Sequence, residues 1–283
     1  MIELRHSAWE AKLVPQIGGS IATLSWRGAD ILRPGRASEH NPLALGCFPL
    51  LPYVNRIARG RFVWQGEVHQ LRCDHDDPRW SLHGLGWHRA WEVADQGIDA
   101  ARLTLDHAPD ADWPWPFHAE QAFALSTKGL LAVLSLTNHA EGAVPMGLGF
   151  HPYFQSGPQT RLTTQVAAAW GADAAILPTT RLAPDAFGDW AAGDRVARPQ
   201  PVDNGYEGWA GRAVIDHGDF RVVLQAPEAR FFHLYVPPAS RFFVAEPVTH
   251  LPNAINRPDM PPMPVLVPGE TARLTMTISA EAD

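Results

Sequence analysis

Two residues capable of acid and base chemistry stand in unusual local settings. His151 lies in the stretch 147–154, where Pro152 has no backbone donor and disfavours the α region for the histidine before it. Glu246 ends the apolar run 242–245, and a carboxylate there is costly to bury unless it has partners. Together a histidine and a glutamate could move protons. The alternatives are a core histidine at a strand end and a structural salt bridge from Glu246 to an arginine.

Three further stretches could hold a ligand beside this pair. Asn55 and Arg56 interrupt an apolar approach, and Arg56 has five donors that suit sugar hydroxyls or carboxylates, although it could also be a solvated turn residue. His83 precedes a glycine and is a better acid/base or hydrogen-bonding candidate than His88, which lies between Trp and Arg. Asp203 opens an Asp-Asn-Gly tripeptide, for which we favour a turn.

Several other chemistries lack their sequence signatures. The chain has no Gly-x-Ser-x-Gly elbow, no phosphate-binding Gly-x4-Gly-Lys-Ser/Thr loop and no dinucleotide fingerprint. His75, His83 and His88 lie close in sequence, but their spacing is neither His-x-His nor His-x3-His. Cys47 and Cys73 do not resemble a paired metal knuckle. We therefore expect no metal site, and a reaction limited to proton transfer.

The composition narrows the class of protein. The 283 residues are 46% hydrophobic and 19% charged, with a formal net charge of −7. This acidic balance argues against nucleic-acid binding and against adhesion to an anionic membrane, since both need clustered positive charge. We expect a cytoplasmic protein, because no signal-like pattern opens the chain and no run of about 18 apolar residues occurs.

Alternation with period two predicts a mostly β chain. We expect a hairpin from 62–64 and 68–71, and a longer one over 117–138 that turns at Lys128 and Gly129. The Pro-rich segment 258–268 reads as a long irregular loop, and 166–176 as a short helix or another strand. Further strands are predicted at 222–224, 231–236, 242–245 and 273–278. We predict a single antiparallel β domain over residues 1–283, either a sandwich or a distorted barrel.

Four motifs, taken in order, resemble those of the aldose 1-epimerase (mutarotase) family, specifically its compact bacterial members. They are Asn-Arg-Ile-Ala-Arg-Gly-Arg-Phe at 55–62, Leu-His-Gly at 82–84, Gly-Phe-His-Pro-Tyr-Phe at 149–154 and Ala-Glu-Pro at 245–247. The resemblance extends from about residue 10 to residue 278. It implies a large antiparallel β-sandwich that interconverts the α and β anomers of free aldoses without metal or organic cofactor. The expected partner is a small sugar, and the chain is expected to be a monomer or a homodimer.

The resemblance also implies roles for single residues. Glu246 resembles the general base that removes the proton of the anomeric hydroxyl, and His151 resembles the acid that protonates the ring oxygen. His83 is grouped with this catalytic pair, as a residue that also holds sugar oxygens. An ionised Glu beside a protonated His is expected close to neutral pH, because the unperturbed pKa values are about 4.3 and 6.5. The expected substrate-binding set is Arg56, Asn55 and Asp203.

Some features leave the substrate open. Leu85 stands where many relatives carry a second glycine after the His-Gly pair, which puts a preference for galactose or glucose in doubt. Stacking on the sugar is a role for Trp64, Trp80 or Trp87, although most Trp residues belong to cores.

Three alternative functions are kept. A hexose-6-phosphate epimerase would use a phosphate clamp of arginines, a non-catalytic sugar-binding module would need no acid/base pair, and a metalloenzyme would ligate its ion through histidines. The clamp candidates are Arg33, Arg36, Arg59 and Arg79, and the metal candidates are His75, His83 and His151.

Overall fold

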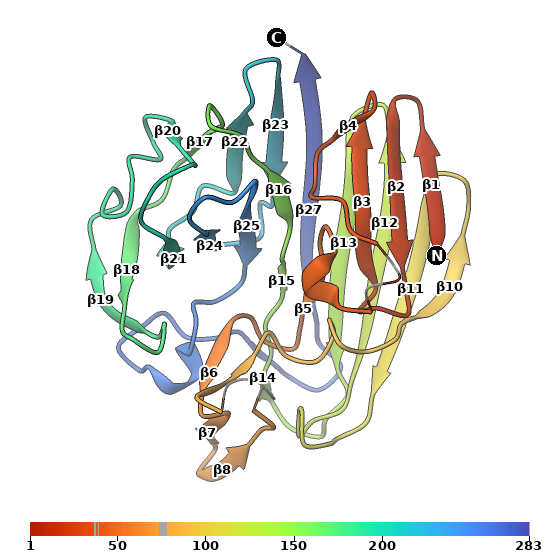
Figure 1. Cartoon of the computed structure of the whole chain (residues 1–283). Helices are drawn as coiled ribbons and strands as arrows, with labels where there is room; N and C mark the ends of the chain where they lie inside the picture. The colour runs from red at the N-terminus through yellow and green to blue at the C-terminus, as the bar shows by residue number, and fades with distance from the viewer. Residues whose placement is uncertain (37, 39, 74–77, 283) are drawn as a thin grey trace.

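The protein is built almost entirely of β-strands (Figure 1). The computed structural model describes residues 1–283 except 37, 39, 74–77 and 283. Within these residues all paired strands run antiparallel, and no helix is long and apolar enough to cross a membrane. Short 3-10 helices are η2 (Pro42–Ala44) and η3 (Ala254–Asn256).

Two large sheets dominate the described part of the chain. The nine-stranded sheet has the order β10 (Glu92–Gln96), β11 (Ala100–His107), β12 (Phe117–Ser126), β13 (Gly129–Asn138), β27 (Thr271–Ala282), β23 (Phe220–Gln225), β22 (Arg212–Asp216), β17 (Arg161–Thr164) and β20 (Asp194–Arg195). The eight-stranded sheet has the order β19 (Pro178–Leu182), β18 (Ala168–Ala172), β21 (Val202–Glu207), β24 (Phe231–Val236), β25 (Phe242–Val248), β15 (Gly149–Phe150) and β5 (Pro49–Leu50), and β16 (Tyr153–Gln155) also pairs with β25.

Smaller sheets complete the described fold. A four-stranded sheet contains β1 (Ile2–His6), β2 (Trp9–Val14), β3 (Ser20–Trp26) and β4 (Ala29–Asp30). The strand pairs are β6 (Arg56–Ala58) with β9 (Trp80–Leu82), β7 (Arg61–Trp64) with β8 (Glu67–Gln70), and β14 (Val144–Pro145) with β26 (Val265–Leu266).

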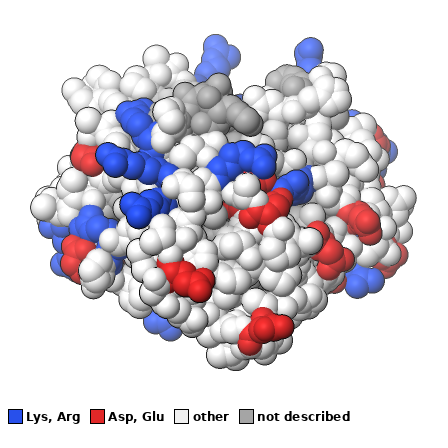
Figure 2. Space-filling view, turned by 90° about the horizontal axis from the view of Figure 1, so that it is seen from below, with Lys and Arg blue, Asp and Glu red and all other residues white. Residues whose placement is uncertain are grey.

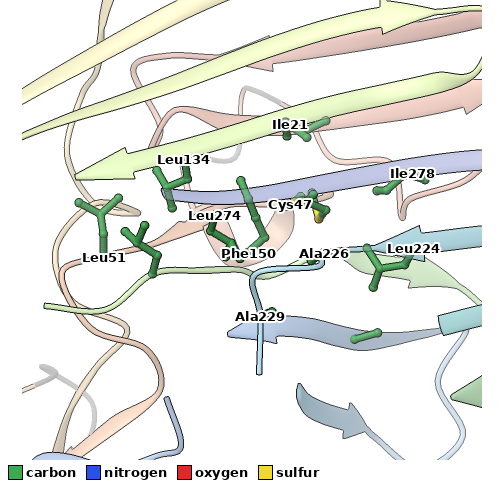
Figure 3. Packing of buried hydrophobic residues seen from close by; sticks show 14 of the residues in the cluster. Ile21, Cys47, Leu51, Leu134, Phe150, Leu224, Ala226, Ala229, Leu274 and Ile278 are labelled. Carbon is green, nitrogen blue, oxygen red and sulfur yellow. The ribbon is translucent and has the colours of Figure 1, made fainter. Parts of the chain in front are cut away.

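The two large sheets share one hydrophobic core. Leu134 and Leu274 of the nine-stranded sheet belong to the same buried cluster as Leu234 and Ala245 of the eight-stranded sheet. Figure 3 shows part of this cluster, with Phe150 of β15 beside Leu274 of β27. The predicted antiparallel β-sandwich is therefore confirmed.

The second face of the eight-stranded sheet is also covered. In β25, Phe243 and Ala245 belong to the main core, whereas Val244 and Val248 belong to a separate buried cluster. Glu246 lies between these two valines in the two-residue period of the strand, so its side chain points away from the main core. The sheet thus separates an apolar core from a second, buried layer that contains polar groups.

The structure confirms both predicted hairpins and corrects two local predictions. β7 and β8 pair across a turn at residues 65–66, and β12 and β13 pair across residues 127–128. The segment 166–176 contains strand β18, which is one of the two alternatives kept for it. The segment 258–268, expected to be irregular throughout, contains the short strand β26. The turn expected at Asp203 is wrong, because Asp203 lies inside β21. There Gly205 serves close packing, since a Cβ atom on it would lie 2.8 Å from Cδ2 of Leu251.

Charges of both signs share the end of the molecule where β7 and β8 lie. Figure 2 views this end and shows Lys and Arg side chains mostly above the Asp and Glu side chains.

Exposed ion pairs such as Arg102–Glu120, at 3.2 Å, contribute little to stability, typically about 0–1 kcal/mol.

A tight turn after β9 positions His83. Gly84 has φ +69°, and a Cβ atom on it would lie 2.1 Å from the carbonyl oxygen of Leu51. Gly66, in the β7–β8 turn, has φ +87°, but a Cβ atom on it would have no neighbouring atom within 4 Å. Only the first of the two glycines is needed for close packing as well as for backbone conformation.

We expect Gly84→Ala to destabilise the fold far more than Gly66→Ala. The left-handed conformation alone costs a non-glycine residue about 1–2 kcal/mol, so Gly66→Ala should lose about that much. Gly84→Ala adds a backbone clash and should lose several kcal/mol. Urea unfolding of both variants measures the difference, and equal losses would contradict the packing argument.

Candidate active site

Three neighbouring strands carry polar side chains on one face of the eight-stranded sheet. His233 of β24 pairs directly with Glu246 of β25 on one side and with Gly205 of β21 on the other. Asp203 lies two residues from Gly205 and so projects to the same face. His233 and Glu246 are buried, with relative exposures of 3% and 1%. The register of the sheet therefore collects two carboxyl groups and an imidazole in the second buried layer.

Two loops bring further side chains to this face. Asn55 and His83 both adopt positive φ, at 55° and 58°. They hold each other, since the Asn55 backbone N–H donates to Nδ1 of His83 at 3.1 Å and the His83 N–H donates to the Asn55 carbonyl at 2.8 Å. Non-glycine residues in this conformation are uncommon and cluster at functional sites. Because Nδ1 of His83 accepts a hydrogen bond, the ring proton of the neutral imidazole lies on Nε2.

His151 lies in the link between β15 and β16. Its backbone N–H donates to the carbonyl of Phe48, and its ring stacks on the Phe48 ring with centroids 4.4 Å apart and an interplanar angle of 15°. Nε2 of His151 lies 3.5 Å from Oε1 of Glu246. The pair is close enough to exchange a proton after a small movement, and both side chains are held by their surroundings.

Burial sets the proton positions of this pair. It raises the pKa of Glu246 to about 7 and lowers the pKa of His151 to about 3, because each charged form loses its hydration. An ionised Glu246 beside a protonated His151 was expected near neutrality, and burial shifts both pKa values in the direction opposite to that expectation. These opposite directions favour a single proton on the pair at mildly acidic pH, with Glu246 protonated and His151 neutral. Burial, with His151 nearby, also lowers the pKa of His83 well below its usual value.

A second group of contacts fixes an arginine. Nη2 of Arg56 lies 3.3 Å from Oδ2 of Asp203, and Nη1 of Arg56 donates to Oδ1 of Asn55 at 3.0 Å. Nε2 of His233 lies 2.7 Å from Oδ1 of Asp203. Burial opposes ionisation of Asp203, but the hydrogen bond from His233 and the charge of Arg56 hold the pKa of this carboxyl below its usual value. The carboxylate is thus ionised and held at both oxygens.

Seven residues form a closed set of contacts, which we call the site ring. Glu246 lies 3.5 Å from His151, and the ring centroid of His151 lies 5.1 Å from that of His83. Hydrogen bonds and ion pairs then connect His83 through Asn55, Arg56 and Asp203 to His233. His233 closes the set, because it pairs with Glu246 across the strands. The structure therefore brings together all six residues that the sequence analysis selected as catalytic or substrate-binding. They are Glu246, His151, His83, Arg56, Asn55 and Asp203.

The seventh residue, His233, was not among the residues selected from the sequence. It lies in the predicted strand 231–236, where the alternation places a histidine among apolar residues. The same signal, a titratable side chain in an apolar strand, selected Glu246. Only the strand pairing shows that His233 and Glu246 are neighbours.

Several buried polar atoms of the site ring have no hydrogen-bond partner. In the described part of the chain seven buried side-chain N or O atoms lack one, and four of these belong to the ring. They are Oε2 of Glu246, Nε of Arg56, Nδ1 of His151 and Nδ1 of His233. Buried polar groups are usually satisfied, so this concentration indicates a place where a polar ligand supplies partners.

Other residues selected from the sequence have different surroundings. His88 is exposed, and Leu85 is 2% exposed and part of the main core. Among the Trp candidates, Trp87 is buried and stacks on Phe48, whereas Trp80 lies beneath the guanidinium of Arg56 at 4.9 Å.

Two arginines of the suggested phosphate clamp have protein contacts. The guanidinium of Arg33 donates to the carbonyl of Leu45 and lies 3.8 Å from the ring centroid of Tyr153. The guanidinium of Arg79 lies 4.3 Å from the ring centroid of Trp80. His75, named for a metal site, lies outside the described residues. Among the described residues no group of three or more His, Cys, Asp or Glu side chains is arranged to hold a metal ion.

Comparison with known proteins supports the assignment of the fold and identifies the family. The profile of the family Aldose 1-epimerase matches residues 1–279. The uncharacterized protein YphB of Escherichia coli K12 is 30% identical, and the match covers 93% of each chain. The crystal structure of a candidate aldose 1-epimerase from Escherichia coli K12 has a TM-score of 0.91 and 29% identity, and covers 99% of this chain and 98% of that one.

More distant structures share the fold alone. A galactose mutarotase-like protein from Clostridium acetobutylicum has a TM-score of 0.88 at 21% identity, covering 99% of this chain and 95% of that one. A galactose 1-epimerase from Lactobacillus acidophilus has a TM-score of 0.80 at 17% identity, covering 99% and 93%.

The fold and the site thus define a β-sandwich protein with a buried acid/base pair among hydrogen-bonding groups. Given the match over residues 1–279, the chain belongs to the aldose 1-epimerase family.

We expect Glu246→Gln to stabilise the protein at pH 8 but not at pH 4. Because the folded-state pKa of Glu246 is raised from 4.5 to about 7, ionisation disfavours the folded state, and stability is lost as pH rises through this window. Glutamine cannot ionise, so the variant should gain on the order of 2–3 kcal/mol at pH 8. Urea unfolding at both pH values measures the change, with the partly exposed Glu120→Gln as control. A variant less stable than wild type at both pH values would refute this view of Glu246.

Proposed function

We propose that the protein is an aldose 1-epimerase that interconverts the α and β anomers of a free aldose. The observation that carries the proposal is the site ring, which combines an acid/base pair 3.5 Å apart with four buried polar atoms that lack partners. A sugar offers many hydroxyl groups to such atoms, and its ring opens by the movement of two protons. Membership of the family supports the same reaction.

The proposed reaction uses Glu246 as base and His151 as acid. The Glu246 carboxylate removes the proton of the anomeric hydroxyl, the C1–O1 bond becomes a carbonyl and the C1–O5 bond breaks. His151 gives its proton to O5, which leaves the open aldehyde. After rotation about C1–C2 the same steps run in reverse on the other face of the carbonyl, and both residues recover their original protonation.

Sugar binding would prepare the pair for this reaction. The anomeric hydroxyl donates a hydrogen bond, which favours the ionised form of Glu246, whose Oε2 has no partner among the described residues. The ring oxygen can only accept, which favours a protonated His151. The single proton of the pair would therefore pass from Glu246 to His151 as the sugar enters, across the 3.5 Å that separates Nε2 from Oε1.

Four further residues of the site ring would hold the sugar. Arg56 offers a donor at Nε, and Asp203 offers acceptor capacity beside it. Asn55 can donate from Nδ2, and His83 from Nε2, since Nδ1 of His83 already accepts a hydrogen bond. Alternating donors and acceptors of this kind suit neighbouring hydroxyl groups.

We expect wild-type protein to speed the relaxation of freshly dissolved α-D-glucose or α-D-galactose to its anomeric equilibrium. Glu246→Gln should fall to the buffer rate, because positioned acid and base groups typically contribute about 10²–10⁴-fold each. Polarimetry measures both, with Glu120→Gln as the active control. Saturable binding of a sugar without faster exchange would support a binding module instead. Exchange of glucose 6-phosphate alone, among the sugars tried, would replace the free aldose by a phosphosugar.

We expect kcat/KM to fall as pH rises above about 7. The Glu246–His151 pair of the free enzyme loses its single proton there, because burial raises the pKa of Glu246 to about 7 and leaves His151 neutral. Initial rates between pH 5 and 9, corrected for the spontaneous reaction, measure this limb. A rate that increases through pH 7, or stays flat from pH 5 to 9 with chemistry limiting, would contradict a mechanism that needs one proton on the pair.

A further inference from the structure

His233 occupies the centre of the site-ring face but has no part in the proton transfers proposed above. It pairs across the strands with both Glu246 and Gly205, and its side chain reaches Asp203 on the strand that carries Gly205. With 3% exposure it is almost fully buried. The side chain of His233 is therefore placed to interact with the polar groups of this face.

The hydrogen bonds of His233 define its tautomer. Nε2 lies 2.7 Å from Oδ1 of Asp203 and 3.4 Å from Nδ2 of Asn55. An ionised carboxylate only accepts, so Nε2 carries the proton and donates it to Asp203. The same nitrogen cannot then accept from Asn55, and the longer contact is not a hydrogen bond. The Nδ2 group of Asn55 is left to donate to a ligand.

His233 thereby controls the orientation of Asp203. One carboxylate oxygen receives the proton of His233 and the other lies 3.3 Å from Nη2 of Arg56. Without the imidazole, Oδ1 would be free to turn toward another donor, and Oδ2 would move with it. Arg56 would then be held through Asn55 alone, at 3.0 Å. The position of Arg56 depends on His233 through one intermediate residue.

The surrounding chain fixes the ring of His233. A Cβ atom on Gly205 would lie 3.8 Å from Nδ1 of His233 and 2.8 Å from Leu251, so the absence of a side chain there leaves space for both. Leu251 is fully buried and covers this side of the sheet. The imidazole therefore has one polar contact to make within the sheet, which is the one to Asp203.

We propose that His233 is a positioning residue for substrate binding, which fixes Asp203 and through it Arg56 for recognition of the sugar hydroxyls. The inference rests on the proposed function, because it assigns Asp203 and Arg56 to the sugar. It predicts that His233 affects the binding of the sugar through Asp203.

A double-mutant cycle tests this dependence. We expect His233→Leu to raise KM for the preferred aldose about tenfold and to change kcat less than threefold. In an Asp203→Ala background the same substitution should change KM less than twofold, because there is no carboxylate left to position. Changes that multiply independently would overturn the proposal.

Conservative variants separate positioning from a structural role. The amide nitrogen of Gln reaches the place of Nε2, whereas that of Asn reaches the place of Nδ1. We expect His233→Gln to restore KM to within threefold of wild type and His233→Asn to behave like His233→Leu. Equal loss in both would overturn the proposal, and the pair remains informative even if the leucine variant does not fold.

A buried histidine outside the site ring provides the control. His107 is 8% exposed, and its Nε2 lies 2.9 Å from the carbonyl of Trp113. His107→Leu should lower stability and leave KM unchanged.

If wild-type protein exchanges no sugar, the proposed function fails. The double-mutant cycle is then repeated with the Kd of D-glucose or D-galactose, measured by calorimetry, in place of KM. Independent effects on Kd, or no binding of either sugar, would overturn the inference as well.

Discussion

The two-residue period of β25 is the constraint on which the site depends. One face of the strand, with Phe243 and Ala245, packs into the core between the two sheets, and the other face carries Glu246. A shift of one residue in register would place the carboxyl in the apolar core and Ala245 in the site. The same period in β21 and β24 brings Asp203 and His233 to the face of Glu246. Strand pairing therefore fixes the chemistry.

Burial on this face opposes stability while it creates reactivity. Removing Glu246 and His151 from water disfavours their charged forms, which raises the pKa of the acid and lowers that of the imidazole. Asn55 and His83 add backbone conformations that are unfavourable for non-glycine residues. The large shared core of the sandwich offsets these costs, and the groups concerned are those that a sugar would contact under the proposed reaction.

Much of the architecture follows from the sequence, but the relations between distant segments do not. Period-two alternation was enough to predict both hairpins, and an isolated carboxyl in an apolar strand was enough to select Glu246. The tripeptide at Asp203 has the composition of a turn, yet cross-strand pairing with β24 makes it extended. Local propensity cannot include this pairing, which is also why His233 was missed.

The position of Asp203 explains why a turn-like sequence occurs in a central strand. A glycine is needed at position 205 because Leu251 and the ring of His233 lie against it. Asn204 donates from Nδ2 to the carbonyl of Trp170 on the neighbouring strand β18. Asp203 itself needs an extended backbone to reach both His233 and Arg56. Each of the three residues is therefore required by a different neighbour, and together they only resemble a turn. Sequence composition reports the residue types that a site needs, whereas the sheet determines their conformation.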